Sequence, residues 1–313
     1  MKPSILAIDA PRRVAPHGVA WRRLRRNLIG WAFVLPWIVV FLVFLAFPIG
    51  SSLLLSFTSF GLADLRDPLG AEWIGLQNYR DLLRDGTFHQ AALNTLYFVA
   101  AGVPLNLGLG LLIAMGVNRG VGAFATFFRV GYYLPVVTSI VAVAVIWRYM
   151  LNTDLGLLNQ ILRTVGLGEV SWLGNPSVAM PAIIALGVWR NVGGAMVIFL
   201  AGLQGIDRTL YEAAEVDGAG TMQKFRDVTL PLLRPTMLFV TITTGIGFLQ
   251  VFEEPFVMTD GGPLNRTLTV SMYLYEQGFD LFHQGYASAI SYLLFLAVVV
   301  FAAIQFRLLR QQT

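Results

Sequence analysis

The chain alternates between long apolar segments and shorter polar connections. Six segments are mostly apolar over roughly 20 residues or more, the length that an α-helix needs to cross the hydrocarbon core of a bilayer, about 30 Å thick. We predict spans at approximately 29–57, 91–117, 130–151, 178–203, 232–252 and 286–306. This pattern predicts an all-α, polytopic membrane protein with six transmembrane helices.

Four prolines fall inside or at the ends of these spans: Pro36, Pro48, Pro104 and Pro135. Bundled membrane helices tolerate such interruptions because neighbouring helices satisfy the backbone groups that a proline frees. The prolines therefore do not argue against the spans that contain them.

Basic residues are unevenly distributed among the connections. Lysine and arginine are concentrated in the segments 1–27, 118–129, 204–231 and 307–313 and are sparser in the other connections. Because positive charge favours the cytoplasmic side, we predict these four segments, and both termini, in the cytoplasm.

We read residues 1–27 as a basic cytoplasmic tail and residues 28–313 as the six-span domain. The apolar run that follows the tail is longer than the roughly 7–15 residues of a signal peptide, so we expect it to be retained as the first span.

The composition limits the chemistry of the chain. Hydrophobic residues make up 56% and charged residues 13%, against about 25% charged in soluble domains, so few residues face water. There is no cysteine, and the three histidines lie far apart in the sequence, so no metal site is expected. No glycine-rich phosphate-binding loop precedes either lysine, so ATP would have to be used by a partner. We expect no catalytic residue and no bound cofactor.

The connection 204–231 carries the most specific pattern. Asp207 can cap a helix of about two turns, and Gly218 can end it in a conformation that glycine adopts readily. We expect a partly apolar face formed by Tyr211, Ala214 and Val216. A solvated connector with ordinary caps is the alternative, but it would not need a helix, a glycine stop and a proline restart at Pro231 together.

The spacing of this connection resembles the EAA loop of ABC importer permeases. Glu212-Ala213-Ala214 is followed by three residues, Gly218, nine residues and Val228-Thr229-Leu230-Pro231. By this resemblance the short helix is a cytoplasmic coupling helix that docks into a cleft on an ATPase, where Glu212 pairs with a basic group. The ATPase-coupling residues implied are Glu212, Ala213, Ala214, Asp217, Gly218, Leu230 and Pro231.

Further segments are similar to the sugar-importer permeases related to maltose and glycerol-3-phosphate systems. They are Trp73–Tyr79, Asn94-Thr95-Leu96, Arg129–Pro135, Gly156–Asn159 and Thr259–Pro263 with Thr267. The resemblance implies a subunit of a binding-protein-dependent importer that forms the pathway for a carbohydrate, from mono- to oligosaccharide. The same machinery importing a glycerol-phosphate-type or other polar solute is the alternative.

The resemblance also implies partners and a location. The partners are a second permease in a heterodimer, two ATP-binding cassette ATPases that carry ATP and magnesium, an extracytoplasmic solute-binding protein and membrane lipid, with no nucleic acid. The location is the cytoplasmic (inner) membrane of a bacterium or archaeon.

Several polar and aromatic residues fall inside the predicted membrane region. Arg190 lies near the middle of span four, where a charge costs roughly 2.5–3.5 kcal/mol, so it should face the interior of the bundle. Aromatic and hydrogen-bonding side chains together suit a sugar. The candidate pathway residues are Trp189, Arg190, Asn191, Gln250, Phe252, Glu253 and Glu254. A structural Arg–Glu pair between helices is the alternative for Arg190 and the two glutamates, and packing is the alternative for Trp189 and Phe252.

Other classes of membrane protein explain less of the sequence. A stand-alone secondary transporter or channel would account for the spans but not for residues 207–231, and no long internal repeat supports one. A membrane-embedded enzyme would need clustered acids, a metal site or an activated nucleophile. An interaction scaffold would explain the loop but not the charge at Arg190.

Overall fold

The computed structural model describes residues 30–67, 70–119 and 123–310. These residues form helices and loops, and the one β-bridge among them joins Thr58 to Trp73. The all-α prediction is therefore confirmed. The chain divides into two compact units at residues 54 and 55. The predicted basic tail, 1–27, lies outside the described residues.

The described part of the first unit is one apolar helix. It starts at Gly30, passes through the π-helical turn η1 (Leu42–Ala46) and continues as α2 (Phe47–Leu55). The helix is long and apolar enough to cross a membrane, and no residue in its most apolar window is buried. It corresponds to the span predicted at 29–57.

The second unit contains the other described helices. In chain order they are η2 (Leu62–Arg66), α3 (Gln77–Leu82), α4 (Gly86–Arg119), α5 (Ala123–Val137), α6 (Ile140–Met150), α7 (Leu157–Thr164), α8 (Ala179–Gln204), α9 (Arg208–Val216), α10 (Thr221–Lys224), η3 (Phe225–Thr229), α11 (Leu230–Leu232), α12 (Arg234–Leu249), α13 (Glu253–Thr259), α14 (Val270–Tyr275), η4 (Glu276–Asp280) and α15 (Gln284–Arg310).

Four unbroken helices of the described chain are long and apolar enough to span a membrane, and two bent helix pairs bring the number to six. The predicted spans 91–117 and 286–306 lie within α4 and α15, and α8 contains all but the first residue of the predicted span 178–203. The six-span prediction therefore holds when each bent pair is one span.

The predicted span 130–151 is bent in its middle, and the predicted span 232–252 begins at a bend. Thr126–Val137 and Ile140–Met150 meet at 98°, after Pro135 has removed a backbone donor from the last turn of α5. The second pair, Thr221–Leu232 and Arg234–Leu249, meets at 66° beside Pro235, which again cannot donate to the preceding turn.

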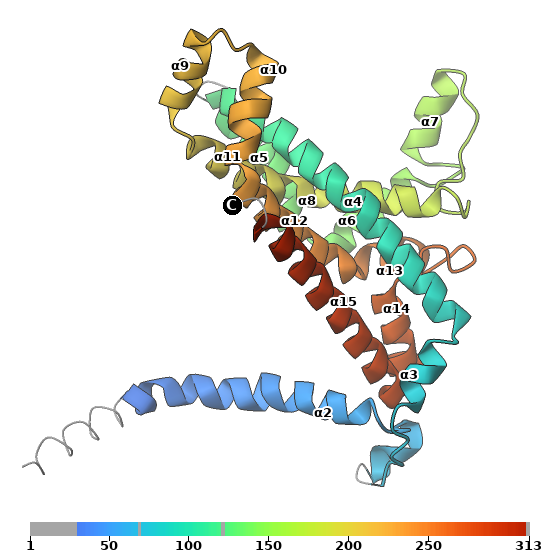
Figure 1. Cartoon of the computed structure of the whole chain (residues 1–313). Coiled ribbons are helices and arrows are strands. Elements are labelled where there is room, and N and C mark those ends of the chain that lie inside the picture. The colour runs from blue at the N-terminus through green and yellow to red at the C-terminus, as the bar shows by residue number, and fades with distance from the viewer. Residues whose placement is uncertain (1–29, 68–69, 120–122, 311–313) are drawn as a thin grey trace, which may run out of the picture. The chain divides into compact units, whose positions relative to one another are not determined.

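The largest helix contact in the second unit is between α4 and α8, and α12 packs against both α4 and α15 (Figure 1). Small residues permit the close approach of these helices. A Cβ on Gly110 would lie 2.8 Å from that of Ala195, and one on Gly193 would overlap the backbone of Tyr132 on α5.

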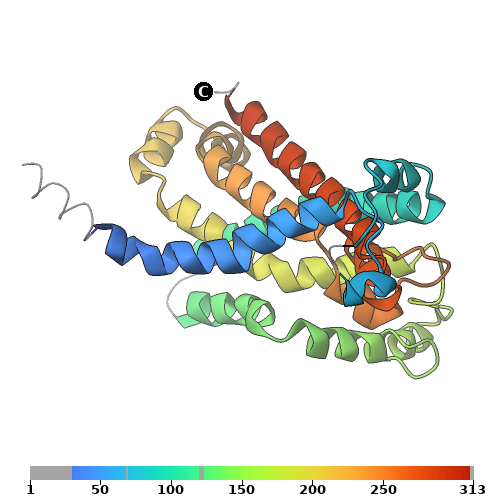
Figure 2. The same ribbon diagram turned by 90° about the horizontal axis from the view of Figure 1, so that it is seen from below.

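The connection 204–231 and the loop between α13 and α14 lie at opposite ends of the second unit (Figure 1). α9 and α10 lie at the end of the bundle where α15 finishes, whereas α3 and α14 lie where α15 begins (Figures 1 and 2). The connection 204–231 therefore lies at the opposite end from the loop between α13 and α14, as the six-span pattern requires.

Candidate functional site

The predicted short helix in the connection 204–231 is α9. The Asp207 carboxylate accepts a hydrogen bond of 2.9 Å from the Thr209 amide, which caps the helix and lowers the pKa of Asp207. The nine residues of α9 agree with the predicted two turns and the predicted cap.

The turn after α9 depends on Gly218. Its φ is +80°, a region that side chains with a Cβ rarely adopt. No atom lies within 4 Å of an added Cβ at this position, so the backbone conformation rather than space favours glycine. The turn redirects the chain into α10.

The two faces of α9 differ in exposure. Glu212, Ala213 and Asp217 are exposed, whereas Tyr211 and Ala214 are half-buried. The prediction that Val216 shares the apolar face is wrong, because Val216 is 88% exposed. Sequence spacing explains the difference: Val216 lies five positions after Tyr211, which is about 140° around an α-helix.

The last two predicted coupling residues, Leu230 and Pro231, lie in α11 and are half-buried. They follow the π-helical turn η3 and precede the 66° bend. Their place is therefore the link between the connection and the fifth span, not the exposed face of α9.

The predicted pathway residues on α8 point in different directions. Trp189 is 43% exposed, and its ring centroid lies 5.6 Å from that of Trp147 on α6. Asn191 donates a 2.8 Å hydrogen bond to the Gly187 carbonyl of its own helix. The donor of Asn191 is therefore partly occupied within α8.

Arg190 is half-buried, and its Nε is buried with no hydrogen-bond partner among the described residues. The helix α13 packs against α8, and its Glu254 is buried. In the described part of the chain, no ion pair within 4.0 Å joins Arg190 to Glu253 or Glu254. A direct structural Arg–Glu pair is therefore not formed here.

Gln250 and Glu253 are exposed, at the end of α12 and the start of α13. Phe252 belongs to an aromatic cluster, with ring centroids 5.0 Å from Phe256 and 5.4 Å from Tyr275. Phe252 also packs against a buried hydrophobic cluster, so the packing alternative explains where its ring lies.

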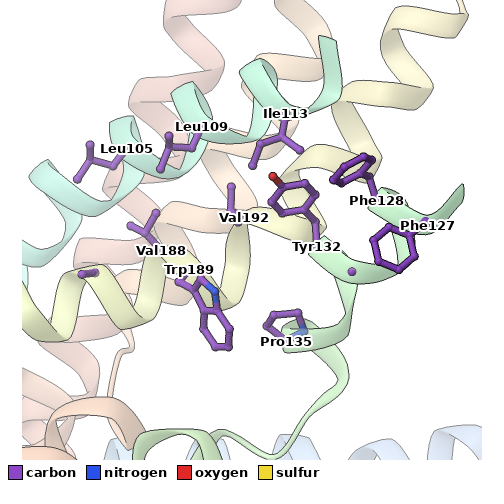
Figure 3. Close-up of a pocket in the computed structure, with 12 residues that line it drawn as sticks. Leu105, Leu109, Ile113, Phe127, Phe128, Tyr132, Pro135, Val188, Trp189 and Val192 are labelled. Carbon is purple, nitrogen blue, oxygen red and sulfur yellow. The ribbon is translucent and has the colours of Figure 1, made fainter. Parts of the chain in front are cut away.

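A cavity of about 580 Å³ lies between α4, α5 and α8 (Figure 3). Its walls are almost entirely apolar and include Leu109, Tyr132 and Trp189. None of the acidic candidates lines it. Trp189 therefore faces an apolar space that does not include Glu253 or Glu254.

Asn94 and Thr95, at the end of the bundle opposite α9, form hydrogen bonds between segments that the sequence analysis did not predict. Asn94 on α4 donates hydrogen bonds of 2.7 and 2.8 Å to the carbonyls of Asn265 and Leu268, and the Thr95 hydroxyl accepts one from the Val270 amide. These bonds attach the loop after α13 to α4. The signal in the sequence is an Asn-Thr pair at the start of an apolar span.

Comparison with known proteins decides the family. Residues 106–312 match the family of binding-protein-dependent transport system inner membrane components. The chain belongs to this family. A probable ABC transporter permease, YesP, from Bacillus subtilis is 38% identical over 91% of this permease and 92% of its own length. The lactose transport system permease LacF from Rhizobium radiobacter is 37% identical, covering 90% and 94%.

A solved structure agrees with the fold of this permease. A chain of the bacterial alginate ABC transporter, determined with an alginate pentasaccharide-bound periplasmic protein, has a TM-score of 0.80 and 25% identity over 94% of this permease and 98% of that chain. These relatives are transport permeases. The resemblance drawn from the EAA spacing is therefore confirmed at the level of the family.

Proposed function

We propose that this permease forms the pathway of an ATP-driven importer for a carbohydrate, from mono- to oligosaccharide, and couples to a separate ATPase through α9. The observation that carries the coupling role is the exposed face of the capped helix, which ends in the positive-φ turn at Gly218. The names of the lactose permease and the alginate transporter support the carbohydrate class.

The exposed face of α9 suits docking into a cleft on an ATPase. Glu212 supplies an exposed negative charge, and Val216, about 40° away around the helix, supplies apolar surface that is 88% exposed. A basic group of the ATPase would pair with Glu212, and Ala213 and Asp217 would lie at the edge of the contact. Gly218, Leu230 and Pro231 act by shaping the chain behind this face.

Hydrolysis belongs to the partner in this proposal. Two ATPase subunits bind ATP and magnesium, and the permease converts their closure into movement of its helices. A second, different permease completes the pathway, and an extracytoplasmic binding protein delivers the carbohydrate. The periplasmic protein in the alginate complex supports this kind of partner.

The orientation follows from charge. The basic connections, including residues 204–231, lie in the cytoplasm together with both termini, in the inner membrane of a bacterium or archaeon. The chain has no natural cysteine, so a cysteine introduced at Gly218 is the only target for a thiol reagent. An impermeant reagent should label it only from the cytoplasmic side. Labelling from outside would overturn this orientation.

The decisive experiment is uptake by the complete complex in liposomes. The binding protein is first screened for thermal stabilisation by lactose, maltose, trehalose and alginate oligosaccharides, together with glycerol-3-phosphate. We expect uptake of a stabilising sugar that requires both the ATPase and ATP. Uptake by the permease alone would instead support a secondary transporter. The relatives do not favour the glycerol-phosphate alternative.

A further inference from the structure

The coupling helix α9 is attached to the rest of the second unit mainly by side chains. None of the other described elements packs its backbone extensively against α9. A cavity of about 330 Å³ lies beside it, lined by Met115 and Asn118 near the end of α4 and by Leu203 near the end of α8. The helix is therefore not held by close packing against these two spans.

One side-chain link beside this cavity starts at Tyr211 of α9, which lines the cavity together with Thr229. The Tyr211 hydroxyl lies 2.9 Å from the Thr229 hydroxyl, and Thr229 is 5% exposed. The Thr229 hydroxyl donates its own hydrogen to the Lys224 carbonyl at 3.3 Å. Tyr211 is therefore the donor to Thr229, and this hydrogen bond joins α9 to the last residue of η3.

A second link lies one helical turn further along α9. Lys224 Nζ and Glu215 Oε1 form an ion pair at 2.5 Å, with side-chain exposures of 21% and 63%. Tyr211 and Glu215 are four residues apart, so they lie on one face of α9. Both links therefore leave one face of α9, and Val216 lies about 100–140° away from it around the helix.

The π-helical turn η3 places the two partners of these links together. Lys224 and Thr229 are five residues apart, which is about 140° around an α-helix. In a π-helical turn the hydrogen bonds run between residues five apart, which brings such residues towards one side. η3 covers Phe225–Thr229, and the Leu230 amide bonds to the Phe225 carbonyl. The turn therefore lets Lys224 and Thr229 both face α9.

We propose that the two links, Tyr211–Thr229 and Glu215–Lys224, are positioning contacts that make α9 and the base of the fifth span move as one body. This inference rests on the coupling role proposed above. Force from an ATPase would reach α11 and α12 through η3, in addition to reaching α8 through the three residues that join α8 to α9. Residues Tyr211, Glu215, Lys224 and Thr229 would not contact the ATP or the carbohydrate.

The links contribute little to folding, and this makes their role testable. An ion pair with one exposed partner is worth about 0–1 kcal/mol. The permease should therefore fold and assemble without either link. What should change is the number of sugar molecules imported for each ATP hydrolysed.

The experiment uses the complete complex in liposomes, with the sugar that stabilises its binding protein. Tyr211→Phe removes one link and Glu215→Gln the other. We expect normal co-purification of the ATPase, continued ATP hydrolysis, and a fall of about fivefold in sugar imported per ATP for each variant, the factor that one net hydrogen bond corresponds to. The exchanged pair Glu215→Lys with Lys224→Glu should restore most of the ratio.

The matched control is Asp227→Asn. Asp227 also forms an ion pair in η3, but with its neighbour Arg226, so the pair joins no two elements. This variant should keep the wild-type ratio. Wild-type ratios in both single variants would overturn the inference, and failure of the exchanged pair to restore the ratio would overturn the link from Glu215. The absence of ATP-driven uptake by the wild-type complex would instead refute the proposed function.

Discussion

The backbone amide of Ala219 donates a 2.9 Å hydrogen bond to the carbonyl of Ala214, across the glycine that ends α9. A second hydrogen bond, of 3.0 Å, runs from the Gly218 amide to the Glu215 carbonyl, within the loop that the first bond closes. The pair of bonds is the Schellman arrangement, which satisfies two carbonyls at a helix end and requires a left-handed residue at the position of Gly218. The turn is thus built into the chain independently of any partner.

We expect Gly218→Val to disrupt coupling. A β-branched residue at φ +80° costs at least about 1–2 kcal/mol, enough to shift α10 relative to α9. ATPase co-purification and ATP-driven uptake should both fall. Gly220→Ala is the control, because Gly220 has an ordinary φ of −69° and room for a methyl group. Equal uptake by the two variants would show that the positive φ is not needed.

Glu212→Ala should weaken docking of the ATPase. The Glu212 side chain is exposed and forms none of the ion pairs of the described residues, so its charge is available to a partner. If the partner buries it, removal costs roughly 3–5 kcal/mol, against about 0–1 kcal/mol for a surface pair. Co-purification with the ATPase measures the loss. Glu169→Gln, which breaks an exposed pair with Arg163, should have no effect. Full co-purification and uptake by Glu212→Ala would refute its role.

Arg190→Met separates a pathway role from a structural one. Among the described residues, the buried Nε of Arg190 has no hydrogen-bond partner and Arg190 forms no ion pair with Glu254, so no direct ion pair requires this arginine. We expect the complex to assemble with little change in its thermal midpoint, while the rate of uptake falls. Asn191→Ala, which removes a hydrogen bond within α8, is the comparison. A lower thermal midpoint with unchanged uptake would assign Arg190 to structure.

The coupling helix was predictable because its determinants are local. Asp207 caps the helix and Gly218 ends it, and each acts on backbone groups within a few residues. The spacing of Glu212 from Gly218 then supplied the resemblance to a family. The prediction that Val216 shares the apolar face of α9 is wrong, because Val216 lies about 140° from Tyr211 around the helix axis.

The bends and the hydrogen bonds of Asn94 were not predictable in the same way. Pro135 is visible in the sequence, but the 98° angle depends on where α6 finds packing partners, including α13. The bonds from Asn94 to the carbonyls of Asn265 and Leu268 join segments more than 170 residues apart. Hydrophobic periodicity contains no information about such pairs.

Asn94→Ala should loosen the loop that follows α13. Asn94 is 6% exposed, and its removal leaves the Asn265 and Leu268 carbonyls without these donors, at a cost of about 1–3 kcal/mol. The thermal midpoint should fall, and a protease should cut the loop faster. Gln90→Ala is the control, since Gln90 donates to Asn94 rather than to the loop. Unchanged proteolysis in Asn94→Ala would contradict the anchoring role.

Asp85 gives a prediction for pH. It precedes α4, and its carboxylate accepts hydrogen bonds of 2.8 Å from the Thr87 amide, 2.5 Å from Tyr273 and 2.7 Å from Tyr286. Burial raises the pKa of Asp85, but the hydrogen bonds from Tyr273, Tyr286 and the backbone outweigh it and hold the pKa below its ordinary value. The ionised carboxylate therefore joins α4, α14 and α15.

Because the pKa of Asp85 is lower in the folded state, ionised Asp85 stabilises the fold at pH values above the unfolded pKa of about 3.9. The stabilisation is lost as the pH falls through the folded pKa. We expect Asp85→Asn to lower the thermal midpoint at pH 7 by an amount that corresponds to about 1–2 kcal/mol, allowing for partial exposure. The difference from the wild type should shrink below about pH 4.

Thermal unfolding in detergent from pH 7 to pH 3 measures both effects, and Asp81→Asn, which removes an exposed carboxylate nearby, is the control. A difference for Asp85→Asn that is constant across this range would show that the charge of Asp85 is not what stabilises the junction.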